Sequence, residues 1–136
     1  FLYAVRGTPH VYYGTEVGLS QPRGKGPWRE EARHPMLWGE AQDQELLAYF
    51  KQLIALRRRH PALWSGSFKT HTLDEAKQVW LVERQAEDDV VLVIVNLSDA
   101  EQPLSLPWSQ AVDLMGAPVH HAVTLPARSV TFFLRP

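Results

Sequence analysis

The stretch QVWLVERQAEDDVVLVIVNL, Gln78–Leu97, holds two runs of apolar and β-branched residues separated by a short acidic segment. Such period-two runs, Gln78–Gln85 and Asp89–Leu97, are typical of β-strands, and the acidic segment marks a turn. Strands at spacings of about 8 to 12 residues favour a sandwich or an open barrel. We therefore predict a small antiparallel β-domain after Pro61. Its remaining strands are expected at Glu101–Leu106, Gln110–Met115 and Ser129–Leu134.

The clearest helix is predicted before this domain, at Asp43–Arg59. Asp43 and Glu45 lie where the helix dipole favours acids, and three arginines lie at the opposite end, where it favours cations. Pro61 then prevents continuation of the helix. The apolar residues recur at three- and four-residue spacing and form one stripe: Leu46, Leu47, Tyr49, Phe50, Leu53, Ile54 and Leu56.

The first forty residues have the pattern of an α/β repeat followed by a long loop. Phe1–Arg6 is mostly apolar and ends in a cation before Gly7, as the last turns of a helix do. Pro9–Tyr13, PHVYY, shows little alternation, which is expected of a strand buried on both faces. Thr15–Glu40 is rich in Gly and Pro, so we predict a loop, and loops of more than about 12 to 15 residues are usually functional or disordered.

The composition excludes several classes of protein. The 136 residues, 45% of them hydrophobic, are enough for one core and too few for a large enzyme. A net charge of −1 argues against a nucleic-acid or anionic-membrane partner, and no apolar run reaches the roughly 20 residues of a membrane span. The absence of cysteine excludes disulfides and thiolate zinc sites. Nucleotide-binding and serine-hydrolase motifs are absent from the sequence.

Acidic residues near the first glycines are the first candidates for chemistry. Glu16 follows the predicted strand, the position at which α/β barrels keep their active sites. Hydrolysis of glycosidic bonds needs two positioned carboxyls, and Glu16 has no second one close in the sequence. We therefore interpret Glu16 as a structural residue. Glu30 and Glu31 are adjacent, so their side chains point apart in most backbones, and we interpret them as solvated charges.

The long loop also carries groups that bind sugars in other proteins. The guanidinium of Arg33 either binds hydroxyls or holds a carboxylate, and the sequence leaves both uses open. Trp28 and Trp38 suit stacking on sugar rings, although an aromatic side chain in a loop is more commonly buried in packing. The six histidines lack the helical i, i+4 spacing of a metal site, so we expect no metal here: His10, His34, His60, His71, His120 and His121.

Several segments, in order along the chain, resemble those of one family. Gly7–Leu19, GTPHVYYGTEVGL, resembles the G-x-P-x-x-Y-Y-G-x-E-x-G motif of the α-amylase family, glycoside hydrolase family 13. Arg33–Trp38, RHPMLW, is similar to that family's R-x-P-M-x-W segment, and Leu53–Leu63 to its final barrel helix. Val91–Ser98 and Leu125–Val130 are similar to its C-terminal β-domain. The resemblance therefore extends over nearly the whole chain.

The resemblance implies a fold in two parts, α/β followed by all-β. Residues 1–62 would form the C-terminal part of a (β/α)8 TIM barrel, and residues 63–136 an antiparallel β-sandwich domain. The family cleaves α-glucosidic bonds with retention, using an aspartate nucleophile and a glutamate acid/base that follow earlier barrel strands. The G-x-R-x-D motif typical of those strands is absent from this sequence. We therefore expect no catalytic residue in this chain and no activity from it alone.

Arg33 is the one substrate-binding residue that the resemblance implies, as the arginine that contacts sugar on the non-reducing side of the cleavage point. Tyr12, Tyr13 and Glu16 match floor and rim positions of the barrel, for which we expect structural roles. The family's frequent D-P-x-N-R is replaced here by Arg29–Arg33, REEAR.

The expected partners are the N-terminal remainder of the same polypeptide and an α-glucan or maltooligosaccharide, with no nucleic acid and no membrane. We expect no cofactor in this segment, and calcium in the intact enzyme stays an open question. The leading interpretation is an enzyme of the neopullulanase and cyclomaltodextrinase kind. The alternative is a non-catalytic carbohydrate-binding or structural β-sandwich module.

Overall fold

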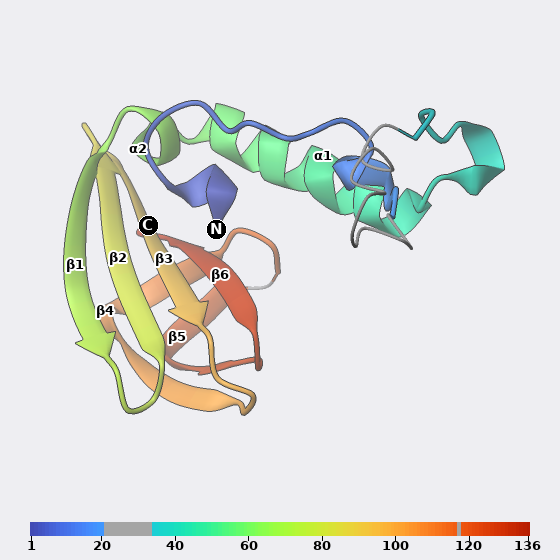
Figure 1. The fold of residues 1–136 in the computed structure, drawn as a ribbon. Coiled ribbons are helices and arrows are strands. Elements are labelled where there is room, and N and C mark those ends of the chain that lie inside the picture. Colours follow the sequence, from blue (N-terminus) through green and yellow to red (C-terminus); the bar gives the residue numbers. More distant parts are fainter. Residues whose placement is uncertain (21–33, 117) are drawn as a thin grey trace. The chain divides into compact units, whose positions relative to one another are not determined.

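The computed structural model describes residues 1–20, 34–116 and 118–136, whose elements are labelled in Figure 1. The residues belong to two compact units, one of Pro9–Ala55 and one of Phe1–Thr8 with Leu56–Pro136. Short 3-10 helices occur at Leu2–Ala4, Thr15–Val17 and Gly39–Ala41. The longer elements are α1 (Gln44–Arg59), α2 (Pro61–Trp64), β1 (Ser67–Asp74), β2 (Val79–Ala86), β3 (Asp89–Asn96), β4 (Gln102–Asp113), β5 (Pro118–Leu125) and β6 (Ser129–Leu134). Neither α1 nor α2 is long and apolar enough to cross a membrane.

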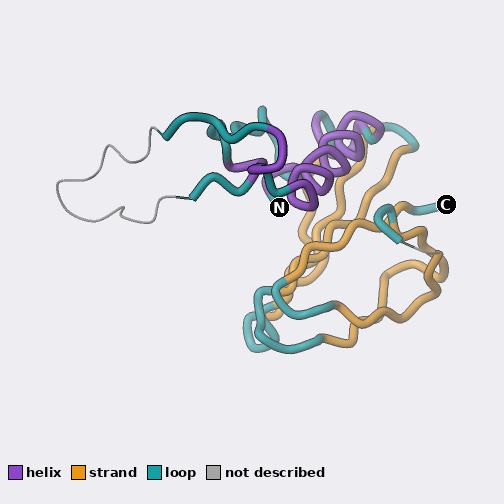
Figure 2. Tube along the Cα trace, turned by 90° about the vertical axis from the view of Figure 1, so that its right-hand side faces the viewer, coloured by secondary structure: helices purple, strands orange, loops and turns teal. Residues whose placement is uncertain are grey.

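The six strands form one antiparallel sheet in the order β1-β2-β3-β6-β4-β5. β4 pairs with β5 on both sides of a register shift between Ser105 and Gln110. Its pairing with β6 is confined to Val112 and Asp113, at the end of the strand. The sheet bends at this junction, so that β4 and β5 pass behind β2, β3 and β6 in Figure 1, and Figure 2 shows the same bend from the side. A single bent sheet thus supplies both layers of the β-domain.

The hydrophobic core lies between these two layers. Its members come from β2, β3, β4, β5 and β6, and each large apolar side chain buried this way contributes about 1.5–3 kcal/mol to stability. Leu104, Trp108 and Val123 pack against the core while staying partly exposed. The buried members are Val79, Leu81, Leu92, Ile94, Leu106, Ala111, Leu125 and Phe133.

β3 is buried on both of its faces, since every residue from Val90 to Asn96 is buried. Leu92 and Ile94 belong to the core between the layers. Side chains alternate along a strand, so the valines between and beside them point to the opposite face of the sheet. That face is covered in part by α2, which contacts β2 and β3 and whose Leu63 is fully buried.

Asp89, at the start of β3, joins α2 to the sheet. Its Oδ1 lies 2.9 Å from Nδ1 of His60, and its Oδ2 accepts a hydrogen bond of 2.9 Å from the backbone N–H of Ala62. The first N–H groups of a helix have no partner within the helix, so the carboxylate satisfies one that α2 leaves free. This contact fixes the short helix against the β2–β3 hairpin.

Arg84 in β2 is a fully buried cation that binds backbone carbonyls. Its Nε donates to Ser67 O at 2.8 Å, and its Nη atoms donate to Gly66 O, Leu63 O and Ala4 O. Burial in this position lowers the pKa of the guanidinium. The side chain connects β2 with the α2–β1 connection and with the first residues of the chain.

Arg57, in the last turn of α1, makes a second set of bonds of the same kind. Its Nη1 donates to the carbonyls of Tyr3, Val5 and Leu63 at 2.7–2.8 Å, and its Nη2 donates to Gly7 O at 2.5 Å. Desolvation by burial also lowers the pKa of this guanidinium. Arg57 and Arg84 therefore hold the segment from Tyr3 to Gly7 on the β-domain, and the described residues provide neither guanidinium with a carboxylate partner.

The elements predicted from periodicity are largely confirmed. α1 begins one residue after the predicted start and ends at Arg59 as expected, and β2, β3 and β6 match their predicted ranges to within a residue or two. Two predicted short strands are joined in the structure as β4, whose register shift replaces the expected break. β1 and β5 were not predicted. β1 is largely polar and exposed, and β5, PVHHAVTL, lacks a clear apolar alternation, as edge strands can.

The prediction of a buried strand at Pro9–Tyr13 is wrong for this chain. These residues are irregular, and the side chains of Tyr12 and Tyr13 are 50% and 41% exposed. A parallel strand needs neighbouring strands to pair its backbone groups, and the six strands of the described residues all belong to the antiparallel sheet. The helix end expected at Phe1–Arg6 is reduced to the 3-10 turn Leu2–Ala4.

Asn96, fully buried at the end of β3, organises two loops at once. Its Nδ2 donates to Ala100 O at 2.9 Å and to Pro126 O at 2.8 Å, and its Oδ1 accepts from both the N–H and the Oγ of Ser98. A buried amide with all of its groups bonded contributes stability, and its loss leaves several backbone groups unpaired.

We expect Asn96→Ala to lower the free energy of unfolding by about 1–3 kcal/mol, because buried carbonyls lose their donor. The matched control is Leu97→Ala, the next residue, whose side chain is 58% exposed and whose replacement should change stability by at most about 0.5 kcal/mol. Urea unfolding followed by tryptophan fluorescence measures both. Equal effects from the two substitutions would show that the amide bonds do not stabilise the loops.

Candidate functional site

The residues around the first glycine motif form a tight turn in the unit Pro9–Ala55. Gly14 and Gly18 both have positive φ, 85° and 75°, and they flank the 3-10 helix Thr15–Val17. The N–H of Leu19 donates to Gly14 O at 2.9 Å and closes the turn. A Cβ on Gly14 would lie 2.5 Å from Leu19 Cδ2, so only glycine fits this position.

Hydrogen bonds connect this turn with the two ends of the segment that follows it. The hydroxyl of Tyr13 donates to His34 O at 2.9 Å. The N–H of Asp43 donates to Val17 O at 3.1 Å, and the carboxylate of Asp43 accepts from Leu46 N at 2.9 Å and so caps α1. The turn is thereby joined to the RHPMLW segment and to the start of the helix.

Two buried polar atoms in this unit, Oε2 of Glu16 and Nε2 of His34, have no hydrogen-bond partner among residues 1–20, 34–116 and 118–136. Burying a polar atom without a partner costs about 1–3 kcal/mol, so such atoms mark places where a group from outside the described residues would be stabilising. The interpretation of Glu16 as a structural residue stays a prediction, since it caps no amide and pairs with no arginine among the described residues.

The one residue predicted to bind substrate, Arg33, lies outside the described residues, as do Trp28, Glu30 and Glu31. Trp38, the other predicted stacking residue, is 76% exposed and immediately precedes the 3-10 helix Gly39–Ala41. It is therefore available for contact with a partner.

The histidines are dispersed in the structure. His71 Nε2 lies 3.0 Å from Oε2 of Glu83 in the β1–β2 pair, and His121 Nδ1 lies 3.3 Å from Trp108 O. His60 contacts Asp89 as described above, and the side chain of His120 is outside what the structure describes. Within residues 1–20, 34–116 and 118–136, no group of three His, Asp or Glu side chains is arranged to hold a metal ion.

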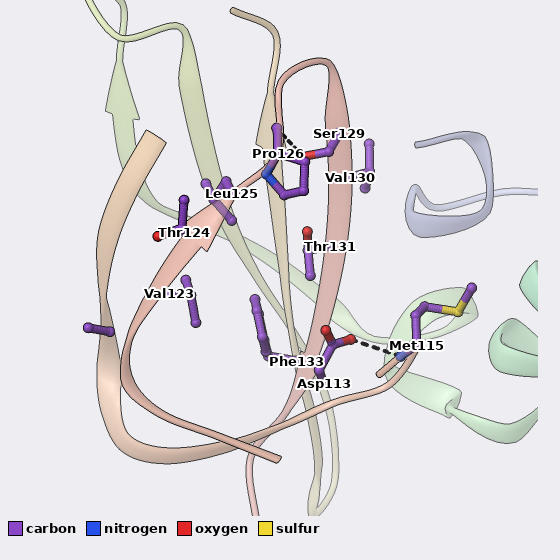
Figure 3. Close-up of a pocket in the computed structure, with 11 residues that line it drawn as sticks. Asp113, Met115, Val123, Thr124, Leu125, Pro126, Ser129, Val130, Thr131 and Phe133 are labelled. Carbon is purple, nitrogen blue, oxygen red and sulfur yellow. Dashed lines mark hydrogen bonds between the residues drawn. The ribbon is translucent and has the colours of Figure 1, made fainter. Parts of the chain in front are cut away.

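A cavity of about 530 Å³ opens between β5, β6 and the end of β4 (Figure 3). Val123, Leu125 and Phe133 form its apolar part, and Thr124 and Thr131 provide hydroxyls. Asp113 is the single carboxylate among the described residues that line it, and its Oδ1 accepts a bond of 2.8 Å from the N–H of Met115. Hydrolysis of glycosidic bonds normally uses two carboxyls, of which the described lining provides one.

Comparison with known proteins decides the family. No family model matches the chain. Alpha-amylase 2 of Dictyoglomus thermophilum is 32% identical over 111 residues, which are 78% of this chain and 19% of that protein. The cyclomaltodextrinase of a Bacillus species is 34% identical over 105 residues, or 76% of this chain and 18% of that protein. The chain belongs to the α-amylase family.

Solved structures with this fold include other enzymes of the α-amylase family. The maltogenic amylase from S. marinus superposes with a TM-score of 0.77 and 22% identity over 98% of this chain and 18% of its own. AmyP in complex with maltose superposes with a TM-score of 0.76 and 23% identity, again over 98% of this chain and 32% of its own. At these identities the superposition shows the fold alone. The present chain spans less than a fifth of the length of alpha-amylase 2 and of the cyclomaltodextrinase.

We expect Gly14→Ala to destabilise the turn much more than Gly39→Ala does. Both glycines have positive φ, which costs an alanine roughly 1–2 kcal/mol, but only at Gly14 does the new Cβ collide with Leu19, whereas nothing lies within 4 Å at Gly39. Hydrogen exchange of Leu19 and Asp43 amides, together with denaturant unfolding, measures the difference. Equal losses of stability would contradict the tight packing of the turn.

Proposed function

We propose that this chain is the C-terminal segment of an α-glucan-processing glycoside hydrolase of the α-amylase family. The proposal rests on the 32–34% identity of this chain to alpha-amylase 2 and to a cyclomaltodextrinase. The matched residues make up about three quarters of this chain but under a fifth of each of those two proteins. The intact protein then cleaves α-glucosidic bonds with retention. Its partners are the remaining N-terminal polypeptide and an α-glucan or maltooligosaccharide.

In this proposal residues 1–62 complete a (β/α)8 barrel, and residues 63–136 form the β-domain that follows it. α1 supports this assignment, since its Tyr49 and Ile54 are 46% and 42% exposed, and neighbouring barrel helices would cover such side chains. Oε2 of Glu16, which is buried and has no partner among the described residues, is a second place at which a donor from the rest of the barrel would fit.

The described acids do not form a catalytic pair. A retaining mechanism requires two carboxyls about 5–5.5 Å apart, one as nucleophile and one as acid/base. In the unit Pro9–Ala55 the carboxylate of Asp43 caps α1, and Glu40 and Glu45 are exposed residues at the start of that helix region. Glu16 alone is partly buried near the glycine turn. We place the catalytic carboxyls in the remainder of the polypeptide, and in this proposal the present chain contributes substrate contacts and support.

The activity of this chain and of the full-length enzyme on a chromogenic maltooligosaccharide tests the proposal. We expect hydrolysis by the full-length protein and none above background by the 136-residue chain, because the latter lacks the carboxyl pair. Turnover by the chain alone would contradict the location of the catalytic residues. Binding of maltooligosaccharide to an inactive full-length protein, measured by calorimetry, would instead indicate a carbohydrate-binding module.

Arg33 is proposed to contact substrate sugar hydroxyls through its guanidinium. In the full-length enzyme, Arg33→Ala should lower kcat/KM roughly 10- to 100-fold, since a hydrogen bond from a charged donor is worth about 1.5–3 kcal/mol. Arg59→Ala, which removes an exposed arginine at the end of α1, is the matched control and should leave kcat/KM unchanged. An unchanged kcat/KM in the Arg33 variant would remove this residue from the binding site.

A further inference from the structure

An apolar strip lies on the outer face of β1 and β2. The ring of Trp80 lies 5.4 Å from that of Phe1 and 5.7 Å from that of Phe68. Leu73 is the cross-strand partner of Trp80, so its side chain lies on the same face of the sheet. We call these four residues, Phe1, Phe68, Leu73 and Trp80, the apolar strip.

The strip is exposed to an unusual degree for packed apolar residues. Phe1, Phe68 and Leu73 are 44%, 38% and 62% exposed, and Leu2, which follows Phe1 in the sequence, is 43% exposed. Contiguous apolar surface of this kind marks a place where another polypeptide docks. The guanidinium of Arg84 stacks over the Phe68 ring at 5.4 Å and forms the border of the strip.

The first residues of the chain reach this strip as the end of a helix. Leu2–Ala4 is one 3-10 turn, closed by Ala4 N donating to Phe1 O at 2.7 Å. The carbonyls of Tyr3, Ala4 and Val5 have left the turn and accept from Arg57 and Arg84 instead. Cations at free carbonyls are the arrangement found at the C-terminal end of a helix.

Phe1 is the point at which preceding polypeptide would join this turn. Its ring lies 5.4 Å from that of Trp80, so the first residue of the turn lies on the strip. In the relatives more than four fifths of the polypeptide lies outside the matched region. Enough polypeptide is therefore present in the intact enzyme to cover the strip.

We propose that the strand residues of the apolar strip, Phe68, Leu73 and Trp80, form with Arg57 and Arg84 the docking surface for the helix that ends at Val5. In this proposal Phe1 belongs to that helix, and the polypeptide preceding it continues the helix across the strip. The two arginines bind the last carbonyls of the helix, and the aromatic side chains bind its apolar face. The inference rests on the proposed function, in that it requires this chain to be part of the longer enzyme.

Hydroxyl-radical footprinting of the full-length enzyme tests the docking surface. Leu73 and Leu97 are a matched pair, because they are the same residue type and are 62% and 58% exposed in the present chain. We expect Leu73 to be modified several-fold more slowly than Leu97. Trp80 should likewise react more slowly than Trp108, a second partly buried strand tryptophan that packs on the core between the layers. Equal rates within both pairs would overturn the proposal.

Two further arms identify what covers the strip. Protection of Leu73 that disappears on dilution would assign the strip to a second copy of the protein, and protection that requires added maltooligosaccharide would assign it to substrate; either result overturns the proposal. Leu73→Ser should lower the Tm of the full-length enzyme while Leu97→Ser leaves it unchanged. Hydrolysis of maltooligosaccharide is measured on the same samples. Protection without hydrolysis would contradict only the proposed function, and hydrolysis without protection only the docking surface.

Discussion

The burial of β3 on both faces is the constraint on which the β-domain depends. A strand that is apolar at every position from Val90 to Val95 needs a cover on each side, because exposing either set of side chains would cost several kcal/mol. The bend at the β4–β6 junction supplies the first cover, since it brings β4 and β5 over the core. α2 contributes to the second cover through Leu63.

Buried polar groups hold these covers in place. The hydrogen bonds of Arg57 and Arg84 within the described residues all go to carbonyl oxygens, among them those of Tyr3, Ala4 and Leu63, and these bonds compensate two desolvated cations. Asn96, at the C-terminal end of β3, likewise binds backbone carbonyls, and its side-chain amide joins two loops. A buried group of this kind is costly to leave unpaired, which makes each of these contacts specific to one arrangement of the chain.

Local sequence patterns predicted the helix and strands that are determined by residues close together in the sequence. The apolar stripe with acids at its start and arginines at its end predicted α1, and the period-two runs predicted β2, β3 and β6. β1 and β5 were missed because edge strands need no apolar alternation. Pro9–Tyr13 was predicted as a buried strand, but a parallel strand exists only beside other strands, and the described residues provide none for it. Arg33 was the main residue predicted for the candidate site, and it lies outside the described residues.

The sequence by itself determined the family, through motifs such as GTPHVYYGTEVGL and RHPMLW, and it determined the helix and the central strands. Only the tertiary structure decided which groups meet across long separations. Three features of the structure have no signature in the local sequence. They are the hydrogen bond of Arg84 to the first residues of the chain, the bend that makes two layers from one sheet, and the apolar strip on β1 and β2. Periodicity and capping act over a few residues, whereas the partners of a buried cation and the cover of a strand are settled by packing of the whole chain.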